Sequence, residues 1–236
     1  MTLILSLLFS FCFAFELPSG LQSDEQRRVL DAVGLGATSK FLSNAYPLGG
    51  YSGFETSLTL EAIDTKDIAT FGNTTRQTST VYLPSITIGK GIFNNSDIFI
   101  HFVPPRKNQD ITRYGASFRW GFYQALFLPL NFSAVFHTGL INIGNDVSAT
   151  NLGADIIMGM HLAQFNFVLG GGWANSSGRF TGGTNGVTAS LNTETQKVES
   201  SHFMFGATYN FEPFFMGFAI DRYQDVVYSL KSGFLF

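Results

Sequence analysis

The chain has 236 residues, of which 45% are hydrophobic, 15% aromatic and only 13% charged, and its formal net charge is −3. It carries no basic patch or run, so the composition gives no support to a nucleic-acid partner. The single cysteine, Cys12, lies in an N-terminal apolar stretch. If that stretch is removed, the chain has no disulfide, no thiolate metal ligand and no cysteine nucleophile.

The N-terminal apolar run extends from Leu3 to Phe15 and is interrupted only by Ser6 and Ser10. It is shorter than the ~20 residues that a membrane-spanning helix needs, but it has the length of a signal-peptide core. We therefore expect residues 1–15 to be a signal peptide, and the alternative is a buried element at the start of a domain. No later run of 18 apolar residues occurs, so an exported chain would be either soluble or a β-barrel.

Residues 16–50 form a separate N-terminal segment with one predicted helix. Ser23, three residues before Gln26, resembles a capping start. Apolar residues then follow at helical spacing, and Gly34 or Gly36 can end the helix. This segment is expected either in the periplasm or in the barrel mouth as a plug, with a plain surface helix as the alternative.

From about residue 51 the pattern changes to period two, which places successive side chains on opposite faces of a strand. In residues 113–124 one face is apolar and suits lipid: Tyr114, Ala116, Phe118, Trp120 and Phe122. The other face is small and polar, as a lumen requires: Gly115, Ser117, Arg119, Gly121 and Tyr123. The same division recurs in residues 151–163 and 201–211.

The pattern predicts ten strands, with eight or twelve as alternatives. They lie near residues 51–64, 80–92, 96–104, 113–124, 129–143, 150–163, 165–176, 198–211, 213–222 and 225–236. Most reach the ~9–11 residues with which a tilted strand crosses a bilayer. We therefore predict an all-β fold in which residues 51–236 form a single up-and-down antiparallel transmembrane barrel.

The connections between the predicted strands alternate in length. The long ones are residues 65–79, 105–112, 144–149 and 177–197, and the tight ones are 93–95, 125–128, 164 and 212. Residues 223–224 are a short exception. Bacterial barrels have short periplasmic turns and long outer loops, so this alternation favours a membrane barrel over a soluble β-sandwich.

The last strand carries a family resemblance. Tyr228, Leu230, Phe234 and Phe236 alternate, and the last residue is aromatic. This resembles the closing strand of bacterial outer-membrane β-barrel proteins, although Ser232 stands where a hydrophobic residue is usual. The resemblance implies a location in the bacterial outer membrane, contact with its lipid, and an assembly signal at Phe234 and Phe236 that the barrel-assembly machinery reads.

Alternation places a set of charged or titratable residues on the inner face: Glu55, Glu61, Arg119, Asp155, His161, Asp221 and Lys231. A buried charge must be paired or solvated, so these residues form either a salt-bridged filling or the lining of a narrow pore. The histidines show no HxH or HExxH spacing, and we expect neither a metal site nor a cofactor.

The sequence thus predicts a non-enzymatic outer-membrane barrel that serves as a narrow channel or as a structural or surface protein. One alternative is an outer-membrane enzyme, similar to omptins or to lipid-modifying barrels, although no matching catalytic motif occurs. The other is an adhesin that acts through the loop at residues 177–197, which is rich in Gly, Thr and Asn.

Overall fold

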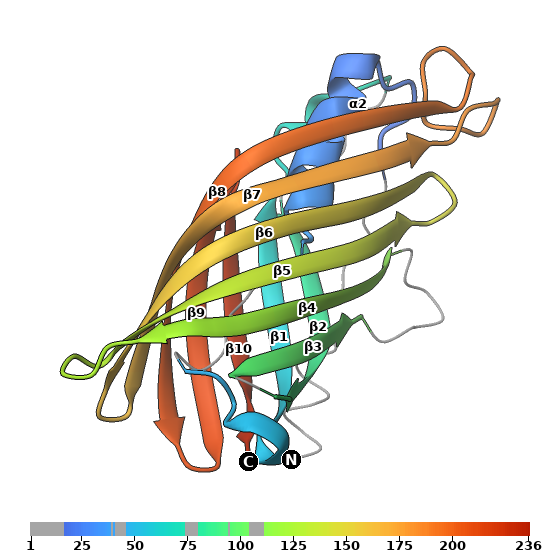
Figure 1. Cartoon of the computed structure of the whole chain (residues 1–236). Coiled ribbons are helices and arrows are strands. Elements are labelled where there is room, and N and C mark those ends of the chain that lie inside the picture. Colours follow the sequence, from blue (N-terminus) through green and yellow to red (C-terminus); the bar gives the residue numbers. More distant parts are fainter. Residues whose placement is uncertain (1–16, 39, 41–45, 74–79, 94, 104–110) are drawn as a thin grey trace.

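The computed structural model describes residues 17–38, 40, 46–73, 80–93, 95–103 and 111–236. The predicted signal peptide, residues 1–15 with Cys12, lies outside the described residues. Within the described part, ten antiparallel strands form a closed barrel in which each strand pairs with its neighbours in sequence and β1 pairs with β10 (Figure 1). This confirms the predicted fold class and strand number.

The strands alternate with turns and loops along the chain. They are β1 (Phe54–Asp64), β2 (Thr80–Gly91), β3 (Ser96–Phe102), β4 (Ile111–Gln124), β5 (Leu130–Ile143), β6 (Val147–Leu162), β7 (Phe165–Phe180), β8 (Glu194–Phe211), β9 (Phe214–Arg222) and β10 (Val226–Leu235). The barrel closes where Leu60 pairs with Leu230 and Ala62 with Tyr228. Each strand of the closed sheet pairs with two neighbouring strands, as a membrane-spanning sheet requires because the hydrocarbon core offers no hydrogen-bond partners.

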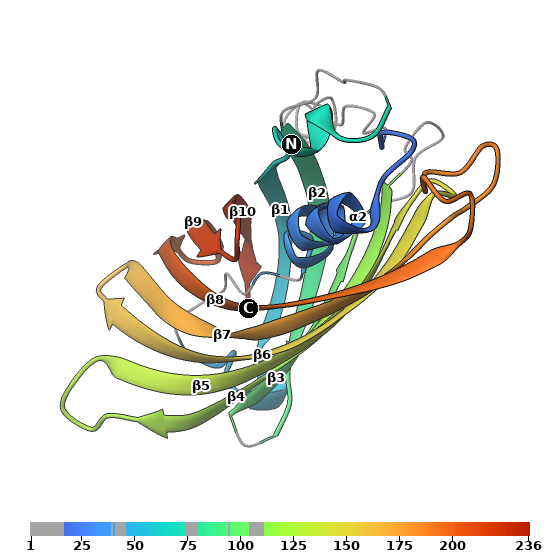
Figure 2. The ribbon, with the colours of Figure 1, turned by 90° about the horizontal axis from the view of Figure 1, so that it is seen from above.

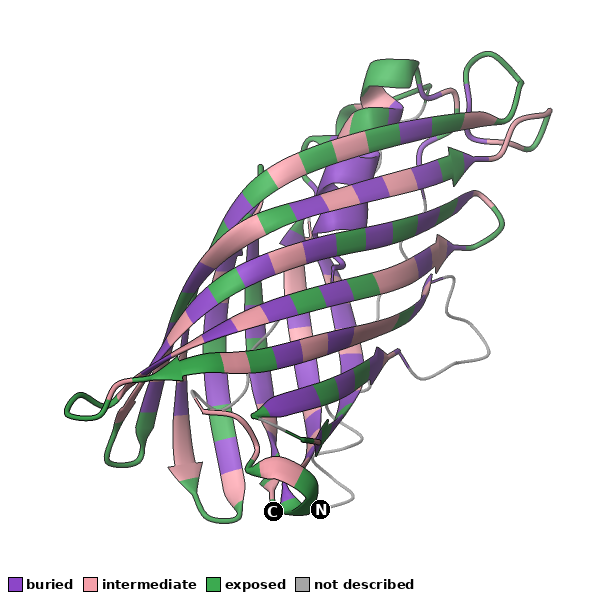
Figure 3. Ribbon diagram, in the orientation of Figure 1, coloured by how far each residue is buried: buried purple, intermediate pink, exposed green. Residues whose placement is uncertain are grey.

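Burial alternates along almost every strand, because one face of the sheet points into the barrel and the other points outward (Figure 3). The outward face is apolar and aromatic, and includes Trp120, Phe136, Leu152, Phe205 and Leu230. The inward face carries most of the buried charged and polar residues. This distribution of polar and apolar residues is the reverse of that in a soluble protein, and it is the one that a lipid environment favours.

The two ends of the barrel differ. At one end, called the inner end below, lie the tight connections between β2 and β3, β4 and β5, β6 and β7, and β8 and β9, together with the start of β1 and the end of β10. The opposite, outer end carries the connections at residues 65–79, 103–110, 144–146, 181–193 and 223–225. The longer connections therefore lie at the outer end, which also carries the short turns at residues 144–146 and 223–225.

The structure corrects three details of the predicted strands. The connection expected at residues 144–149 is a tight turn of residues 144–146, and the loop expected at 177–197 is only 181–193, because β6, β7 and β8 extend further toward the outer end. Tyr123 was expected in the lumen with Gly121, but it is 56% exposed. A register shift between Gly121 and Tyr123 pairs Tyr123 with Phe132 and turns its ring outward.

The N-terminal segment contains helix α2 (Ser23–Val29), which continues into a π-helical turn (Leu30–Leu35) capped by Gly36. Seen along the barrel, α2 lies within the ring of strands (Figure 2). The π-helical turn contacts β1, β6, β7 and β8 from the inside. Within the described residues, no helix is long and apolar enough to cross a membrane.

The outward face gives a test of membrane insertion. Phe136 lies in the middle of β5 and is 52% exposed, so we expect Phe136→Arg to destabilise the barrel by about 2–4 kcal/mol in lipid vesicles. Leu128→Arg, in the β4–β5 turn at the inner end, should cost only about 0–1 kcal/mol. Denaturant unfolding in vesicles measures both, and equal costs for the two variants would contradict a lipid-facing middle of β5.

Candidate functional site

The lumen is the candidate site, and the N-terminal segment enters it at the outer end. The Leu21 N–H donates to the Val187 carbonyl at 2.7 Å, and the Ala189 N–H donates to the Leu21 carbonyl at 3.0 Å. Leu21 and Thr188 thereby form a short parallel bridge. The start of the segment is therefore attached to the loop between β7 and β8.

The N-cap of helix α2 lies one residue before the predicted cap, Ser23. Gln22 is the N-cap, and its N–H donates to the Glu25 carboxylate at 2.8 Å in a reciprocal capping arrangement. Gln26, the expected capping partner of Ser23, is instead fully buried. Its Nε2 donates to the Leu21 carbonyl at 3.0 Å, and its Oε1 accepts from Gln196 at 3.1 Å. The prediction failed because the sequence does not show that strand β8 provides a partner for Gln26.

The apolar face of the helix fills the outer half of the lumen. Val29, Leu30 and Val33 are each about 1% exposed and pack in one cluster with inward residues of the strands, including Ile63 and Phe180. Complete burial of such a side chain stabilises the folded state by roughly 1.5–3 kcal/mol. The outer half of the barrel thus has a hydrophobic core that the N-terminal segment completes.

Ion pairs connect the polar face of the helix to the outer connections. Arg28 Nη1 and Nη2 each lie 2.7 Å from the Asp225 carboxylate in the β9–β10 turn, and Nη2 lies 3.1 Å from Asp67 in the β1–β2 connection. Arg28 also lies 3.6 Å from Asp31, one turn along the helix. A single guanidinium therefore joins the helix to two separate connections of the barrel rim, in part through the bidentate geometry that arginine favours.

Two ionisable groups of the segment are buried. Burial raises the pKa of the Asp31 carboxyl to about 6, an effect that the neighbouring Arg28 opposes. Burial also lowers the pKa of the Lys40 ammonium to about 8, against the attraction of Asp221 and Glu61. Lys40 Nζ lies 4.3 Å from the centre of the Tyr223 ring and donates to the Leu35 carbonyl at 3.2 Å. Lys40 thus places a positive charge inside the barrel, close to inward carboxylates of β1 and β9.

The segment reaches the inner end of the barrel before β1 begins. The Leu48 N–H donates to Asp97 on β3 at 3.0 Å, and the Tyr46 ring contacts His161 edge to face at 6.1 Å. Leu21 lies at the outer end of the lumen, and Leu48 lies at the inner end. In the described residues the segment therefore lies inside the barrel at both ends.

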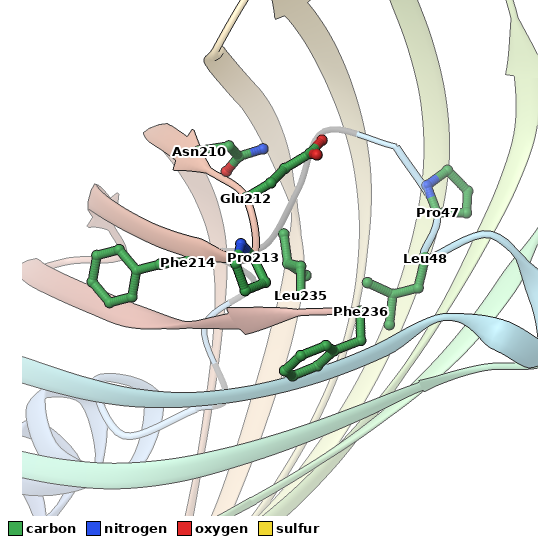
Figure 4. A pocket seen from close by; sticks show the side chains of 8 residues that line it. All are labelled: Pro47, Leu48, Asn210, Glu212, Pro213, Phe214, Leu235 and Phe236. Carbon is green, nitrogen blue, oxygen red and sulfur yellow. The ribbon is translucent and has the colours of Figure 1, made fainter.

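A cavity of about 530 Å³ opens at the inner mouth (Figure 4). Asn210 and Glu212 lie on one side of it, and Pro47 and Leu48 lie on the other. The complete lining is Pro47, Leu48, Asn210, Glu212, Pro213, Phe214, Leu235 and Phe236. Elsewhere in the lumen, Ser133 Oγ, Asn166 Nδ2 and Thr208 Oγ1 are buried without a hydrogen-bond partner among the described residues. Buried polar atoms of this kind are normally hydrated.

The structure places all seven predicted inner residues on the lumen side. Six of them are buried, namely Glu55, Glu61, Arg119, Asp155, Asp221 and Lys231, and His161 is partly buried. The Lys231 ammonium lies 2.6 Å from Glu55. The His161 ring pairs with Asn166 at 2.6 Å. The predicted residues are therefore spread along the barrel and do not form a single cluster.

Two partners of the predicted charges were missed by the sequence analysis. Arg113 forms an ion pair with Glu61 across the lumen, and Asp97 lies 2.6 Å from Arg119, with both side chains fully buried. Arg113 lies six positions before Arg119 in the same strand, so period-two alternation would have placed both side chains on the inner face. The register that sets Asp97 opposite Arg119 was not available from the sequence.

The structure also brings together three residues that sequence spacing did not connect. Asp155 on β6 lies 3.3 Å from His137 Nε2 on β5 and 2.6 Å from His202 Nε2 on β8. The Tyr223 ring stacks on His202 with 4.4 Å between ring centres. Only Asp155 belonged to the predicted set, because the two histidines come from strands far apart in the sequence.

A closed ten-stranded sheet, apolar outside and ion-paired inside, is the structure of a membrane barrel. The chain is a transmembrane β-barrel. Its sequence matches no protein-family model and no curated protein.

Several solved structures are similar in fold. The N-terminal β-barrel domain of Pseudomonas aeruginosa OprF has 13% identity and a TM-score of 0.40, with 79% of this chain and 99% of that chain covered. An outer membrane channel from Pseudomonas putida F1 has 11% identity and a TM-score of 0.44, covering 84% and 100%. Ail, the attachment invasion locus protein of Yersinia pestis, has 11% identity and a TM-score of 0.32, covering 78% and 98%. Similarity at this level does not extend to function.

The Arg119–Asp97 pair gives a test of the inner charges. Arg119→Ala should destabilise the barrel by about 3–5 kcal/mol, because Asp97 would be left as an uncompensated buried charge. Denaturant unfolding in detergent or vesicles measures the loss. Arg222→Ala, at an exposed position at the end of β9, is the matched control and should change stability by less than about 0.5 kcal/mol.

A double variant separates loss of the pair from loss of the side chain. Replacing both partners, as Asp97→Leu with Arg119→Met, should recover part of the stability that Arg119→Ala loses, because no charge remains buried alone. Unchanged unfolding of Arg119→Ala would show that Arg119 takes no part in a structural ion pair.

Proposed function

We propose that this protein is a narrow outer-membrane channel that its N-terminal segment holds closed as a plug. The observation that carries the proposal is that the described residues of the N-terminal segment lie in the lumen at both ends, at Leu21 and the helix on the outer side and at Tyr46 and Leu48 on the inner side. The plug fills the outer half with apolar side chains, while a cavity opens at the inner mouth, where Asn210 and Glu212 lie among apolar lining residues. A barrel that served only as a membrane anchor would need neither a polar lumen nor a separate segment to close it.

The attachment of the plug supports a closure that can be released. Its polar side is held by Arg28 and by the short bridge between Leu21 and Thr188, and both attachments lie at the outer rim. The charges of the surrounding wall are paired with one another, as in Lys231–Glu55 and Arg119–Asp97. Release of the plug at the outer rim would therefore leave these two wall pairs intact.

The adhesin alternative has less support from the described residues. Val187 and Thr188, in the loop between β7 and β8, are buried against the N-terminal segment. Part of this loop thus serves the closure of the lumen, which reduces the surface that it can offer to a partner outside the cell.

The channel proposal is tested by conductance across a planar bilayer. We expect the unaltered protein to be closed for most of the recording, with rare discrete openings. Arg28→Ala should raise the open fraction by on the order of tenfold, which corresponds to the loss of about 1.4 kcal/mol of plug attachment. Lys66→Ala is the control, because its ion pair with Asp64 at the same rim is exposed and does not involve the plug.

A reversible lock sharpens the result. In a chain with Cys12→Ser, a disulfide introduced by Leu21→Cys and Thr188→Cys should abolish openings when oxidised and restore them when reduced. If oxidation leaves the openings unchanged, the plug is not the gate. If Arg28→Ala and a deletion of residues 17–38 both insert without any conductance, the protein is not a channel.

We further propose that the C-terminal strand is the signal for the barrel-assembly machinery, with Phe234 and Phe236 as the recognised side chains. Phe236 bonds to Phe54 through its backbone in both directions, at 2.8 and 2.9 Å, while its ring is 68% exposed. The ring is thus available to another protein without breaking the barrel seam.

Phe236→Ser separates assembly from folding, because the backbone bonds to Phe54 remain. We expect a several-fold lower amount of protein in the outer membrane of cells, together with unchanged refolding in detergent. Tyr51→Ala, which removes an equally exposed ring at the same end, should leave both quantities unchanged. Normal outer-membrane levels of Phe236→Ser would contradict an assembly signal at this residue.

A further inference from the structure

The cluster of His137, Asp155 and His202 is buried in the lumen. Asp155 lies between the two imidazoles, 3.3 Å from His137 Nε2 and 2.6 Å from His202 Nε2. The three side chains are 1–4% exposed, and one nitrogen or oxygen atom from each lies within 4.8 Å of those of the other two. Three different strands, β5, β6 and β8, thus direct a metal-ligating atom toward one point.

Two glycines make room for this convergence. Gly153 pairs with His137 in the sheet, and a Cβ atom at Gly153 would lie 2.3 Å from His137 Cε1. Gly172 pairs with both Asp155 and His202, and a Cβ atom there would lie 2.2 Å from Asp155 Oδ1. Any larger side chain at either position would force the cluster apart. The backbone therefore permits the inward side chains to meet across β7.

Some polar atoms of the cluster have no hydrogen-bond partner in the described part of the chain. Nδ1 of His137 and Nδ1 of His202 are buried without a hydrogen-bond partner among the described residues, and Nε2 of His137 has only the 3.3 Å contact with Asp155. Leaving such a donor or acceptor unsatisfied costs about 1–3 kcal/mol. Arrays of buried imidazole and carboxylate groups are commonly completed by a metal ion, for which neutral histidine is the most frequent ligand.

We propose that His137, Asp155 and His202 bind one divalent transition-metal ion of the zinc class, inside the barrel beneath the N-terminal segment. Tetrahedral zinc with bonds of ~2.0–2.1 Å separates its ligand atoms by about 3.3 Å. His137 Nε2 lies 3.3 Å from one Asp155 oxygen and His202 Nε2 lies 2.6 Å from the other. Since all three ligand atoms lie within 4.8 Å of one another, shifts of at most about 1.5 Å bring them to the spacing of a tetrahedral site. Three protein ligands leave a fourth coordination position for water or a small ligand.

The surroundings favour a cation at this position. Tyr223 stacks on His202 and fixes the orientation of its ring. Asp221 has a buried carboxylate oxygen, Oδ2, without a hydrogen-bond partner among the described residues, and it interacts electrostatically with His202. The carboxylates of Asp155 and Asp221 thus lie near the two imidazoles, with Lys40 as the nearby cation of the N-terminal segment, and two carboxylates at one point attract a divalent ion.

The donor set also selects among metals. Two imidazole nitrogens and one carboxylate suit zinc, cobalt, nickel, copper and ferrous iron. Magnesium and calcium prefer sites made of oxygen ligands alone. The site should therefore bind zinc in the presence of excess magnesium.

Zinc binding to the full chain tests the proposal directly. The protein is refolded in detergent without a polyhistidine tag, stripped with a chelator and titrated with zinc chloride in millimolar magnesium by calorimetry. We expect one zinc ion per chain. His137→Ala and His202→Ala should each weaken binding at least tenfold, which corresponds to about 1.4 kcal/mol. His161→Ala, which removes another lumen histidine outside the cluster, should bind zinc as the unaltered chain does.

Absorption and X-ray measurements on the unaltered chain keep the proposal testable if a variant fails to fold. Cobalt should give visible absorption bands of a site with low coordination number, and zinc-edge X-ray absorption should show two imidazoles in the first shell. No zinc binding, a first shell without imidazole, or undiminished binding in a folded His137→Ala variant would overturn the proposal. These readouts do not depend on conductance, so they remain decisive whether or not the barrel is a channel.

Discussion

The pairing of β1 with β10 is the constraint on which the rest of this structure depends. In a bilayer core, no water is available for the backbone groups of a strand edge, so the sheet must close. Closure fixes one face of every strand outward and the other inward. The apolar outside, the polar lumen and the ion pairs between strands all follow from that division.

Closure also creates a lumen. In an eight-stranded barrel the inward side chains of the strands fill it, but in a ten-stranded barrel they do not fill it alone. This protein fills its lumen in two ways. In the outer half, the N-terminal segment adds apolar side chains and completes a hydrophobic core. Elsewhere, charged residues of the wall pair with one another, as Lys231 does with Glu55. Such charges would be costly alone and become acceptable because they have partners of opposite sign.

Much of this fold could be predicted from the sequence, because period-two alternation directly reports the two faces of a strand. The alternation located all ten strands and placed Glu61, Arg119 and Lys231 in the lumen. It failed at Tyr123, where a β-bulge exchanges the two faces. A bulge adds one residue to a strand without leaving a compositional mark, so no periodicity argument could detect it.

The contacts between strands were beyond the sequence for a different reason. His137 and His202 are separated by 65 positions in the sequence. Both reach Asp155 only because of the register of four consecutive strands, β5 to β8. Likewise, the helix in residues 16–50 could be predicted from its spacing, but its place in the lumen depends on its fit to inward residues of distant strands. Local pattern specifies the elements, whereas their mutual contacts depend on three-dimensional shape.

The path of the N-terminal segment has a topological consequence for how this barrel forms. The segment precedes β1 in the chain, lies along the lumen, and joins β1 at the inner end, while the seam that closes the wall is made by the first and last strands. If the wall closed first, the helix would have to be threaded through the inner mouth and past the paired charges to reach the outer rim. If the segment were in place first, β10 would complete the wall around it. The order of these two events decides whether the segment is enclosed during assembly or inserted afterwards.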